Sequence, residues 1–558
     1  MSSSVSDTEF ITIVQAAADF DDYLCTKYFA PRRESFRLGR RDDGPRIESL
    51  AQLFVNSQSV PNRTGSLLRL RDPSALPPWA LELRQMLTAL EHDLVAKQVS
   101  PLYRLCEYGS HYGLRRLKEQ ISPALLDHIS RKAQARLNTE LRQILARATR
   151  PCFALKLEAF RLASEAIWFH TQATASKITK RNRLAGTPSE QLFSIFKTFP
   201  VLARLWSQLI SQWCNHISEL LLRLSADRRA LSKAFFRGER IDKIVDLRTG
   251  LSDPHNRGRT VVLLQFEAGS IIYKPRTGDG EWEWLKVLRW MNSQSFRPNL
   301  RAARVLRRDG YCWMEHIQPG PCKDQNAARR FYQRAGGMLG AAYLLEAVDC
   351  HRDNLIACGE YPVLIDAETL CHAMRERKTQ SLLDPLYETG FLPRTGQRSS
   401  CQYQSSVLGR TTLGHHAPKI AAKPLSAVRY EMEIINGFRR AWCCLIGTTR
   451  RRVAFVRRLQ RLQCRERRWI YWPTRNYDAI RRASIQPAAL RSAVERDPLI
   501  GRLSARRGVP EVVIREEVNA LKQLDIPYFT RKTTAGPLPE DNAAPTEIVE
   551  SLRHALHL

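Results

Sequence analysis

One stretch of the sequence constrains the fold more than any other: residues 327–348 are small or apolar on nearly every side, and the charged run 349–353 follows at once. The spacing predicts a helix, and a helix without a polar face has to be buried. Its most apolar part, residues 336–348, is too short to cross a bilayer, which takes about 20 residues. The stretch therefore predicts a helix inside a globular core, with a polar loop leaving directly from its end.

The chain is long enough to build such a core. Its 558 residues correspond to about three or four domains, and 43% hydrophobic with 26% charged residues disfavours disordered, fibrous and disulfide-scaffold classes. The first nine residues lack the basic and apolar segments of a signal peptide. Thirteen cysteines, an odd number without any Cys-x-x-Cys, are typical of reduced thiols. We therefore expect a cytoplasmic protein without a membrane span.

Hydrophobic periodicity divides the chain into helical and strand-forming parts. Residues 9–242 are helical nearly throughout, with breaks at prolines that include Pro123, Pro151 and Pro200. From Val245 the pattern changes, and residues 260–266 and 271–275 predict a hairpin with Lys274 at its far end. We expect an α+β fold with a helical region (1–240), a β-rich lobe (241–320), a mainly helical lobe (321–470) and a helical C-terminal region (471–558).

The chain carries a large excess of positive charge. Lys and Arg number 87 against 56 Asp and Glu, a net charge of +31, which fits a nucleic-acid binder, an acidic peptide partner, phosphate chemistry or an arginine-rich proteome. In the densest basic stretch, residues 438–469, apolar residues recur at three- and four-residue spacing. This pattern predicts an amphipathic helix whose arginines are mainly its solvated face.

Residues with catalytic potential gather where the buried helix ends. Asp349, His351 and Asn354 lie in the polar loop, Asp366 ends the second short apolar strand after it, and Lys274 ends a strand upstream. This order suits phosphoryl transfer, in which an acid or imidazole orients the accepting hydroxyl, Asn and Asp hold Mg²⁺, and a lysine reaches the phosphates. The protein-kinase pattern H-R-D-x-x-x-x-N fails, because its Asn would fall on a cysteine at position 358. Each residue alone also fits an ordinary structural role.

In the spacing Asp-x-His-x-x-Asn, with an aspartate twelve residues later, the loop resembles that of phosphoinositide 3-kinase-like lipid kinases. More specifically, residues 349–370 resemble the dehydratase domain of class II lanthipeptide (lantibiotic) synthetases. Other similar pieces follow in the same order from about residue 190 to the end: Ser252-Asp253-Pro254-His255-Asn256, Tyr273-Lys274-Pro275-Arg276, Asp384-Pro385-Leu386, Thr389-Gly390-Phe391-Leu392-Pro393, Thr474-Arg475-Asn476-Tyr477 and Asp525-Ile526-Pro527-Tyr528-Phe529.

The resemblance implies a lipid-kinase-like two-lobe core with extensive added helices. Its activity would be phosphorylation of Ser and Thr in a ribosomally made precursor peptide with ATP and Mg²⁺, followed by phosphate elimination. The roles that it implies are ATP phosphate contact for Lys274 supported by Glu368, Mg²⁺ binding for Asn354 and Asp366, phosphorylation for Asp349 and His351, and elimination for Asp253, His255, Arg468 and Thr474.

The sequence departs from this family in four respects. Asp353 stands where Glu is usual, Ala367 where Leu is commoner, and Trp472 where the family usually has a second Arg near the phosphate. The chain also stops where family members continue into a zinc-dependent cyclase domain. A separate cyclase partner, a truncated gene or a peptide that is not cyclised would each account for this.

Two alternative functions stay open. One is a kinase that phosphorylates without elimination, which is suggested by Trp472 in place of the second Arg. The other is a degenerate basic scaffold that binds peptide or RNA, for which the net charge is the motive. The retained acidic residues Asp349, Asp366 and Glu368 would repel a polyanion, so nucleic acid is not an expected partner.

Overall fold

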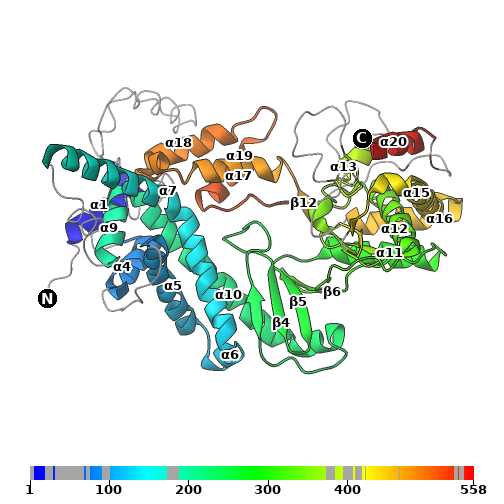
Figure 1. Ribbon diagram of the computed structural model, residues 1–558, viewed down its shortest axis with the longest axis horizontal. Helices are drawn as coiled ribbons and strands as arrows, with labels where there is room; N and C mark the ends of the chain where they lie inside the picture. Colours follow the sequence, from blue (N-terminus) through cyan, green and yellow to red (C-terminus); the bar gives the residue numbers. More distant parts are fainter. Residues whose placement is uncertain are drawn as a thin grey trace. The chain divides into compact units, whose positions relative to one another are not determined.

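The computed structural model describes residues 6–18, 29–31, 68–70, 76–90, 101–171, 188–372, 384–393, 406–408, 417–421, 423–463, 466–532, 538, 544 and 546–557. The chain forms two compact units, each assembled from segments far apart in the sequence (Figure 1). The first unit comprises Met1–Arg228, Asp242–Glu267 and Trp472–Pro527, and the second comprises Arg229–Ile241, Ala268–Tyr471 and Tyr528–Leu558. Helices dominate, and the sheets are small and antiparallel, which agrees with the predicted α+β class.

The first unit is mainly helical, and its helices come from both ends of the sequence. They are α1 (Asp7–Ala17), α4 (Pro78–Leu90), α5 (Pro101–Gln120), α6 (Pro123–Asp127), α7 (Arg131–Thr171), α9 (Pro188–Thr198), α10 (Pro200–Phe235, which continues into the second unit), α17 (Thr474–Ala483), η4 (Pro487–Leu490), α18 (Ala493–Ser504) and α19 (Glu511–Lys522). Two strand pairs complete the unit: β1 (Phe29–Pro31) with β2 (Leu68–Leu70), and β3 (Asp246–Arg248) with β4 (Val262–Phe266).

Where the structure describes residues 9–242, the helical prediction is correct with two exceptions. The strands β1 and β2 interrupt it, and the break expected at Pro151 is absent, because α7 runs through that proline. Proline removes one hydrogen bond from a helix, but Ala148, Cys152 and Phe153 around it are buried. Packing of these neighbours therefore offsets the local loss. Pro123 and Pro200 do begin new helices, where the missing N–H costs nothing.

The second unit combines a small sheet with a helical core. Strands β5 (Gly269–Lys274), β7 (Cys312–Glu315) and β6 (Val305–Arg307) pair in that order, all antiparallel. The other elements are α11 (Asp279–Ser293), α12 (Gln325–Leu344), η2 (Arg352–Asn354), β8 (Leu355–Cys358), β9 (Tyr361–Leu364), α13 (Asp384–Glu388), β10 (Lys419–Ile420), β11 (Lys423–Pro424), η3 (Ala427–Tyr430), α15 (Glu431–Ile446), α16 (Thr449–Gln463), β12 (Glu466–Trp469), β13 (Phe529–Lys532) and α20 (Thr546–His557). Both strands of the predicted hairpin, β4 and β5, therefore form at their expected positions.

The predicted buried helix is α12, and its small residues allow an unusually close contact with α15. The Asp324 side chain caps its first turn by accepting a hydrogen bond from the Ala327 N–H at 2.7 Å. A Cβ atom on Gly336 would lie 2.0 Å from the Ile434 carbonyl oxygen, and one on Gly437 would lie 2.0 Å from that of Gln333. The backbones of α12 and α15 are therefore in contact at these two glycines, where a side chain would force them apart. The loop that follows α12 starts from this tightly packed pair of helices.

The basic stretch differs from its prediction in one respect that matters for the site. Its middle part is the helix α16, as the spacing predicts, but Arg467 and Arg468 lie in strand β12, which pairs with β13. Arg467 is 2% exposed, and the Arg468 side chain is 13% exposed. The interpretation of Arg468 as part of a solvated helix face is therefore wrong. A search for helical periodicity misses this strand because β12 is only four residues long and begins just after α16 ends.

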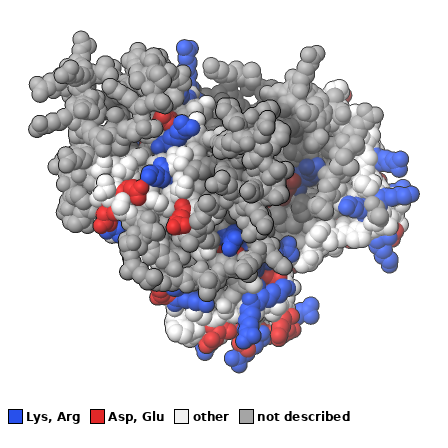
Figure 2. Space-filling model, turned by 60° about the vertical axis from the view of Figure 1, so that its left-hand side comes forward, with Lys and Arg blue, Asp and Glu red and all other residues white. Residues whose placement is uncertain are grey.

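Many of the positive side chains are accompanied by acidic ones. On the face drawn in Figure 2, Lys and Arg side chains project at separate places, and several have Asp or Glu beside them. Among the described residues, no helix is both long enough and apolar enough to cross a bilayer.

Candidate functional site

A buried ion pair joins the predicted lysine to a glutamate that the sequence did not single out. Lys274 ends β5, and its Nζ donates to Glu281 Oε1 at 2.9 Å and to the Ile365 carbonyl oxygen at 2.6 Å. Glu281 lies in the first turn of α11, and its side chain is 2% exposed. Burial opposes ionisation of Glu281, but Arg276 and Lys274 outweigh it and lower the pKa. A strand lysine paired with a helix glutamate is the arrangement that holds the phosphate-binding lysine of protein kinases.

Asp366 and Asn354 lie at one end of the β8–β9 hairpin. The Ile365 N–H donates to the Asn354 carbonyl oxygen at 2.8 Å, which holds the two segments together just before Asp366. Asp366 Oδ2 lies 3.8 Å from Lys274 Nζ, and its side chain is 28% exposed. Burial, partly opposed by Arg276, raises the pKa of Asp366. The structure thus brings Lys274, Asn354 and Asp366 together.

The donor set at this hairpin fits magnesium. The Asn354 amide nitrogen donates to the Asp349 carbonyl oxygen at 2.8 Å, which leaves its amide oxygen as the atom suited to a metal. Among the described residues, no group of three or more His, Cys, Asp or Glu side chains has metal-binding geometry. Mg²⁺ characteristically takes one or two protein ligands and completes its shell with water and substrate phosphates. One carboxylate and one amide oxygen therefore suit Mg²⁺ bound together with a nucleotide.

The side chains of Asp349 and His351 lie next to each other in the loop after α12. The Asp353 N–H donates to His351 Nδ1 at 3.2 Å, so the ring carries its proton on Nε2, which lies 3.3 Å from Asp349 Oδ1. Burial raises the pKa of Asp349, although His351 opposes the shift. Asp349 also has a left-handed backbone with φ of 61°, which is costly and is often found at functional sites.

The turn formed by Thr389 and Gly390 packs against this loop. The Cys350 N–H donates to the Thr389 carbonyl oxygen at 2.8 Å. A Cβ atom on Gly390, whose φ is 83°, would lie 3.1 Å from the His351 nitrogen. The Thr-Gly turn after α13 therefore helps to hold Asp349 in its strained conformation.

Glu368 is the centre of a second set of contacts. Its carboxylate accepts from Arg276 Nε at 3.0 Å and from the Tyr528 hydroxyl at 3.2 Å, and it pairs with Arg468 through its other oxygen. Burial opposes ionisation of Glu368, and Arg276 and Arg468 overcome it, so that the pKa is lowered. Arg276 and Tyr528 belong to short motifs noted in the sequence, but spacing alone assigned them no contact. Their separation from Glu368, 92 residues for Arg276 and 160 for Tyr528, explains why.

Gly280 controls how closely α11 approaches the carboxylates. A Cβ atom at this position would lie 2.0 Å from the Ala367 carbonyl oxygen, between Asp366 and Glu368. We expect Gly280→Ala to lower the free energy of unfolding by about 1–3 kcal/mol. Denaturant unfolding would measure this effect. Gly501→Ala in α18 is the control, since nothing lies within 4 Å of its Cβ position. Equal stability of the two variants would contradict the packing argument.

Three of the four predicted elimination residues lie in the first unit. His255 Nδ1 is 2.7 Å from the Ile526 carbonyl oxygen, so it carries the proton and leaves the basic lone pair on Nε2. Asp253 lies in the same turn, and Thr474 is the first residue of α17. Arg468 belongs to the second unit, with Lys274 and Asp366. The structure thus groups Arg468 with the predicted phosphorylation residues.

Trp472 occupies a packed position in the first unit. Its ring meets Tyr477 edge to face, with centroids 5.6 Å apart, and the Arg506 guanidinium lies 4.2 Å from its centre. Arg506 also pairs with the buried Glu517 at 2.5 Å. The resemblance implies an arginine at position 472. This chain instead has the Trp472 ring there, with the Arg506 guanidinium packed against it.

The turn that carries Asp253 and His255 is anchored by Asp525. The Arg257 N–H donates to Asp525 Oδ2 at 2.5 Å, and the Gly258 N–H donates to Oδ1 at 2.9 Å. Asp525 is 3% exposed. Burial, partly opposed by these hydrogen bonds, raises its pKa from 3.8 to about 6.

This shift predicts a pH-dependent contribution to stability. The unfolded carboxyl loses its proton first as the pH rises, so the contribution of Asp525 is fully present below pH 3.8 and is lost as the pH passes about 6. We expect the free energy of unfolding of the parent, relative to Asp525→Asn, to fall by up to about 3 kcal/mol across this window. Denaturant titrations of both proteins at several pH values would measure it. A constant difference across the window would contradict the assignment.

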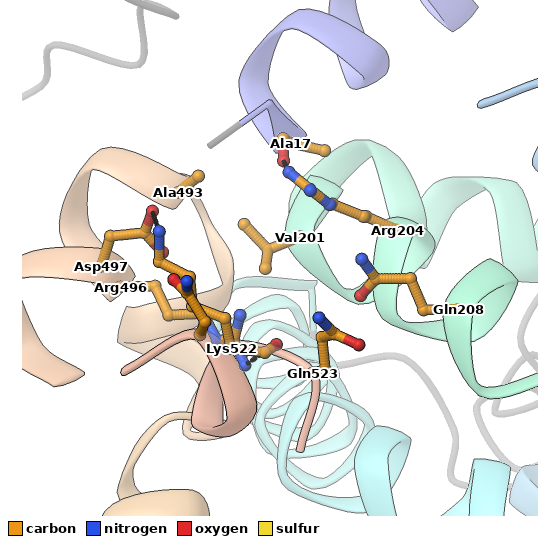
Figure 3. Close-up of a pocket in the computed structure, with 10 residues that line it drawn as sticks. Ala17, Val201, Arg204, Gln208, Ala493, Arg496, Asp497, Lys522 and Gln523 are labelled. Carbon is orange, nitrogen blue, oxygen red and sulfur yellow. Dashed lines mark hydrogen bonds and ion pairs between the residues drawn. The ribbon is translucent and has the colours of Figure 1, made fainter. Parts of the chain in front are cut away.

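The first unit also contains a small cavity (Figure 3). Its volume is about 170 Å³, and its polar lining includes Arg204, Arg496, Asp497 and Lys522, of which Lys522 and Asp497 pair at 3.1 Å. Ligand pockets for molecules of drug or cofactor size are typically about 300–1,000 Å³. None of the predicted site residues lines this cavity, so it is not a candidate nucleotide site.

Comparison with known proteins adds independent information. The profile of a family described as Domain of unknown function (DUF4135) matches residues 199–415 and 410–532, which together make up more than half of the chain. The chain is also 24% identical over 331 residues to the lacticin 481/lactococcin biosynthesis protein LcnDR2 of Lactococcus lactis subsp. lactis. That match covers 50% of this chain and 35% of the relative, so this chain spans about a third of the relative's length. The profile includes every predicted site residue, from Asp253 to Thr474.

Proposed function

Because this chain belongs to the DUF4135 family and resembles the dehydratase region of lanthipeptide synthetases, we propose that it dehydrates Ser and Thr in a ribosomally made precursor peptide. It would transfer a phosphoryl group from ATP to the side-chain hydroxyl and then eliminate phosphate. The proposal rests on one observation: Lys274 pairs with Glu281 and also lies next to Asp366. Asp366 in turn follows directly after Ile365, which is hydrogen-bonded to the loop 349–354. On this proposal the second unit is a lipid-kinase-like catalytic core.

In the phosphorylation step, each residue does what its contacts allow. Mg²⁺, when bound with ATP, would neutralise the phosphate charge, and Asp366 and Asn354 are the side chains that would hold it. Lys274, fixed by Glu281, would contact a phosphate oxygen. Asp349, with its pKa raised, would take the proton of the Ser or Thr hydroxyl, and the His351 Nε2–H would orient the Asp349 carboxylate. The hydroxyl oxygen then forms the new bond to phosphorus as the bond to ADP breaks.

In the elimination step, the phosphorylated residue loses its α-proton to a base, and the carbon–oxygen bond breaks to release phosphate and leave a double bond. His255, whose Nδ1–H is held by the Ile526 carbonyl oxygen, would act as this base through Nε2. Arg468 would hold the leaving phosphate through a charge-assisted hydrogen bond. Asp253 and Thr474 would assist, as the resemblance implies.

The proposal also names a partner. The substrate is a precursor peptide with a leader and a Ser/Thr-containing core. The expected location is the cytoplasm, where ATP and Mg²⁺ are available.

The test is to incubate the purified chain with ATP, Mg²⁺ and a short Ser/Thr/Cys-rich peptide encoded beside its gene, and to weigh the product by mass spectrometry. Loss of one water for each modified residue supports the proposal. A gain of phosphate without water loss would instead identify a kinase, the alternative that Trp472 keeps open. Salt-sensitive binding of arbitrary nucleic acid without ATP consumption would identify a basic scaffold.

A further inference from the structure

Arg276 contacts three carboxylates of the candidate site: Glu281, Asp366 and Glu368. Its Nη1 and Nη2 bind the two oxygens of Glu281 at 3.0 and 2.5 Å, its Nη2 also binds Asp366 Oδ1 at 2.8 Å, and its Nε binds Glu368 Oε2 at 3.0 Å. The side chain is 16% exposed. A planar guanidinium can make such a set of contacts at once, whereas an ammonium cannot match its geometry.

Among the side chains joined by these ion pairs, the formal charges balance without any bound ligand. The three carboxylates, Glu281, Asp366 and Glu368, are matched by three cations, Lys274, Arg276 and Arg468. Carboxylates this close and this poorly solvated would repel one another strongly if they were not compensated. Arg276 therefore does for the free protein what a divalent cation does in a metal site: it neutralises the carboxylates and fixes their spacing.

The contact with Asp366 distinguishes Arg276 from a purely structural ion pair. Asp366 is the most exposed carboxylate of the three, at 28%, against 2% for Glu281 and 8% for Glu368. The oxygen that Arg276 occupies thus belongs to the group that an incoming ligand can reach. A metal that takes this oxygen has to displace Nη2, which then has a proton to donate elsewhere.

We propose that Arg276 takes the place of a metal ion in the free protein. Its Nη2 binds Asp366 Oδ1 until metal and nucleotide bind. It then gives up this oxygen to the metal and donates to a phosphate oxygen. Arg276 is thus a nucleotide-binding residue that lowers the affinity for metal alone and raises the affinity for phosphate. This inference rests on the proposed function, because it takes the cluster as a metal–nucleotide site.

Binding measurements by calorimetry test the exchange without any turnover. With Arg276→Gln, we expect Mn²⁺ alone to bind about tenfold more tightly, because a competing positive charge is gone. ADP without metal should bind about tenfold more weakly, because a phosphate donor is gone. The two affinities change in opposite directions, which partial unfolding cannot produce. Arg307→Gln is the matched control, since Arg307 pairs with Asp279 outside the cluster and should leave both affinities unchanged.

The conservative variant keeps the test decisive if Arg276→Gln does not fold. Arg276→Lys retains the charge but loses the planar guanidinium with its several donors. Mn²⁺ affinity should therefore stay within about threefold of the parent, while ADP affinity falls. Weakening of both ligands together, or no change in either, overturns the inference.

Two outcomes separate this inference from the function on which it rests. If the parent binds Mn²⁺ with ADP and Asp366→Asn abolishes that binding, the nucleotide site stands whatever Arg276 does. If the parent binds neither ligand, the proposed site is wrong and the inference falls with it.

Discussion

Asp366→Asn is expected to abolish ATP-dependent modification of the peptide, with a fall of at least about 100-fold in rate, or about 3 kcal/mol. The change keeps the shape of the side chain but removes the negative charge that would hold Mg²⁺. It also removes one of the three anions that Arg276 contacts. Phosphoryl transfer depends on positioning and charge neutralisation, so the loss should appear in the chemical step. Mass spectrometry of the peptide after a fixed reaction time measures it.

Asp309→Asn is the control for this variant. Asp309 is exposed and lies in the same unit, between β6 and β7, so its change removes an equal charge outside the cluster. We expect it to retain the parent rate. Near-normal turnover by Asp366→Asn would exclude the proposed nucleotide site.

The second large effect concerns the separation of the two half-reactions. Arg468→Ala should still consume ATP, but it should release peptide that carries phosphoserine or phosphothreonine. Without a cation to hold the leaving phosphate, elimination should slow by about 100-fold. Phosphorylation should persist, because Glu368 keeps its contacts with Arg276 and Tyr528 when Arg468 is removed. Comparing ATP consumption with the masses of the products measures both steps.

Arg531→Ala provides the matched control. Arg531 is exposed on β13, the strand that pairs with β12, and it lies against Trp469, without a proposed contact to phosphate. It should dehydrate the peptide as fast as the parent does. An Arg468→Ala variant that dehydrates equally fast would remove Arg468 from the elimination step and leave it as a structural partner of Glu368.

The sequence predicted those parts of the candidate site whose residues lie close together along the chain. The helix α12, the loop that follows it and the two strands after the loop were all predictable, because their hydrophobic pattern and their polar residues lie within one continuous stretch. The sequence also singled out Lys274 and Asp366: Lys274 ends β5, and Asp366 follows the end of β9 by two residues. Their roles in catalysis stay predictions.

The partners of these residues were not predictable, because they depend on contacts between distant segments. Glu281 could have been suspected from its place in the first turn of a helix soon after Lys274. Nothing in the spacing, however, indicates that Tyr528 reaches Glu368 or that Asp525 anchors the turn with His255. The strand that contains Arg468 was missed for the same reason: only its pairing partner, β13, makes β12 a strand.

The pairing of β12 with β13 has a topological consequence. Trp469 and Phe529 are direct partners in this ribbon, so the segment Trp472–Pro527, which carries Thr474 and belongs to the first unit, begins and ends at neighbouring points of the second. An insert with adjacent ends can be lengthened, shortened or exchanged without disturbing the strands that flank it, because closing such a loop costs little extra entropy as it grows. The rest of the first unit limits such changes, because Asp525 in this segment anchors the turn that carries His255, so any replacement for α17–α19 would have to keep that contact.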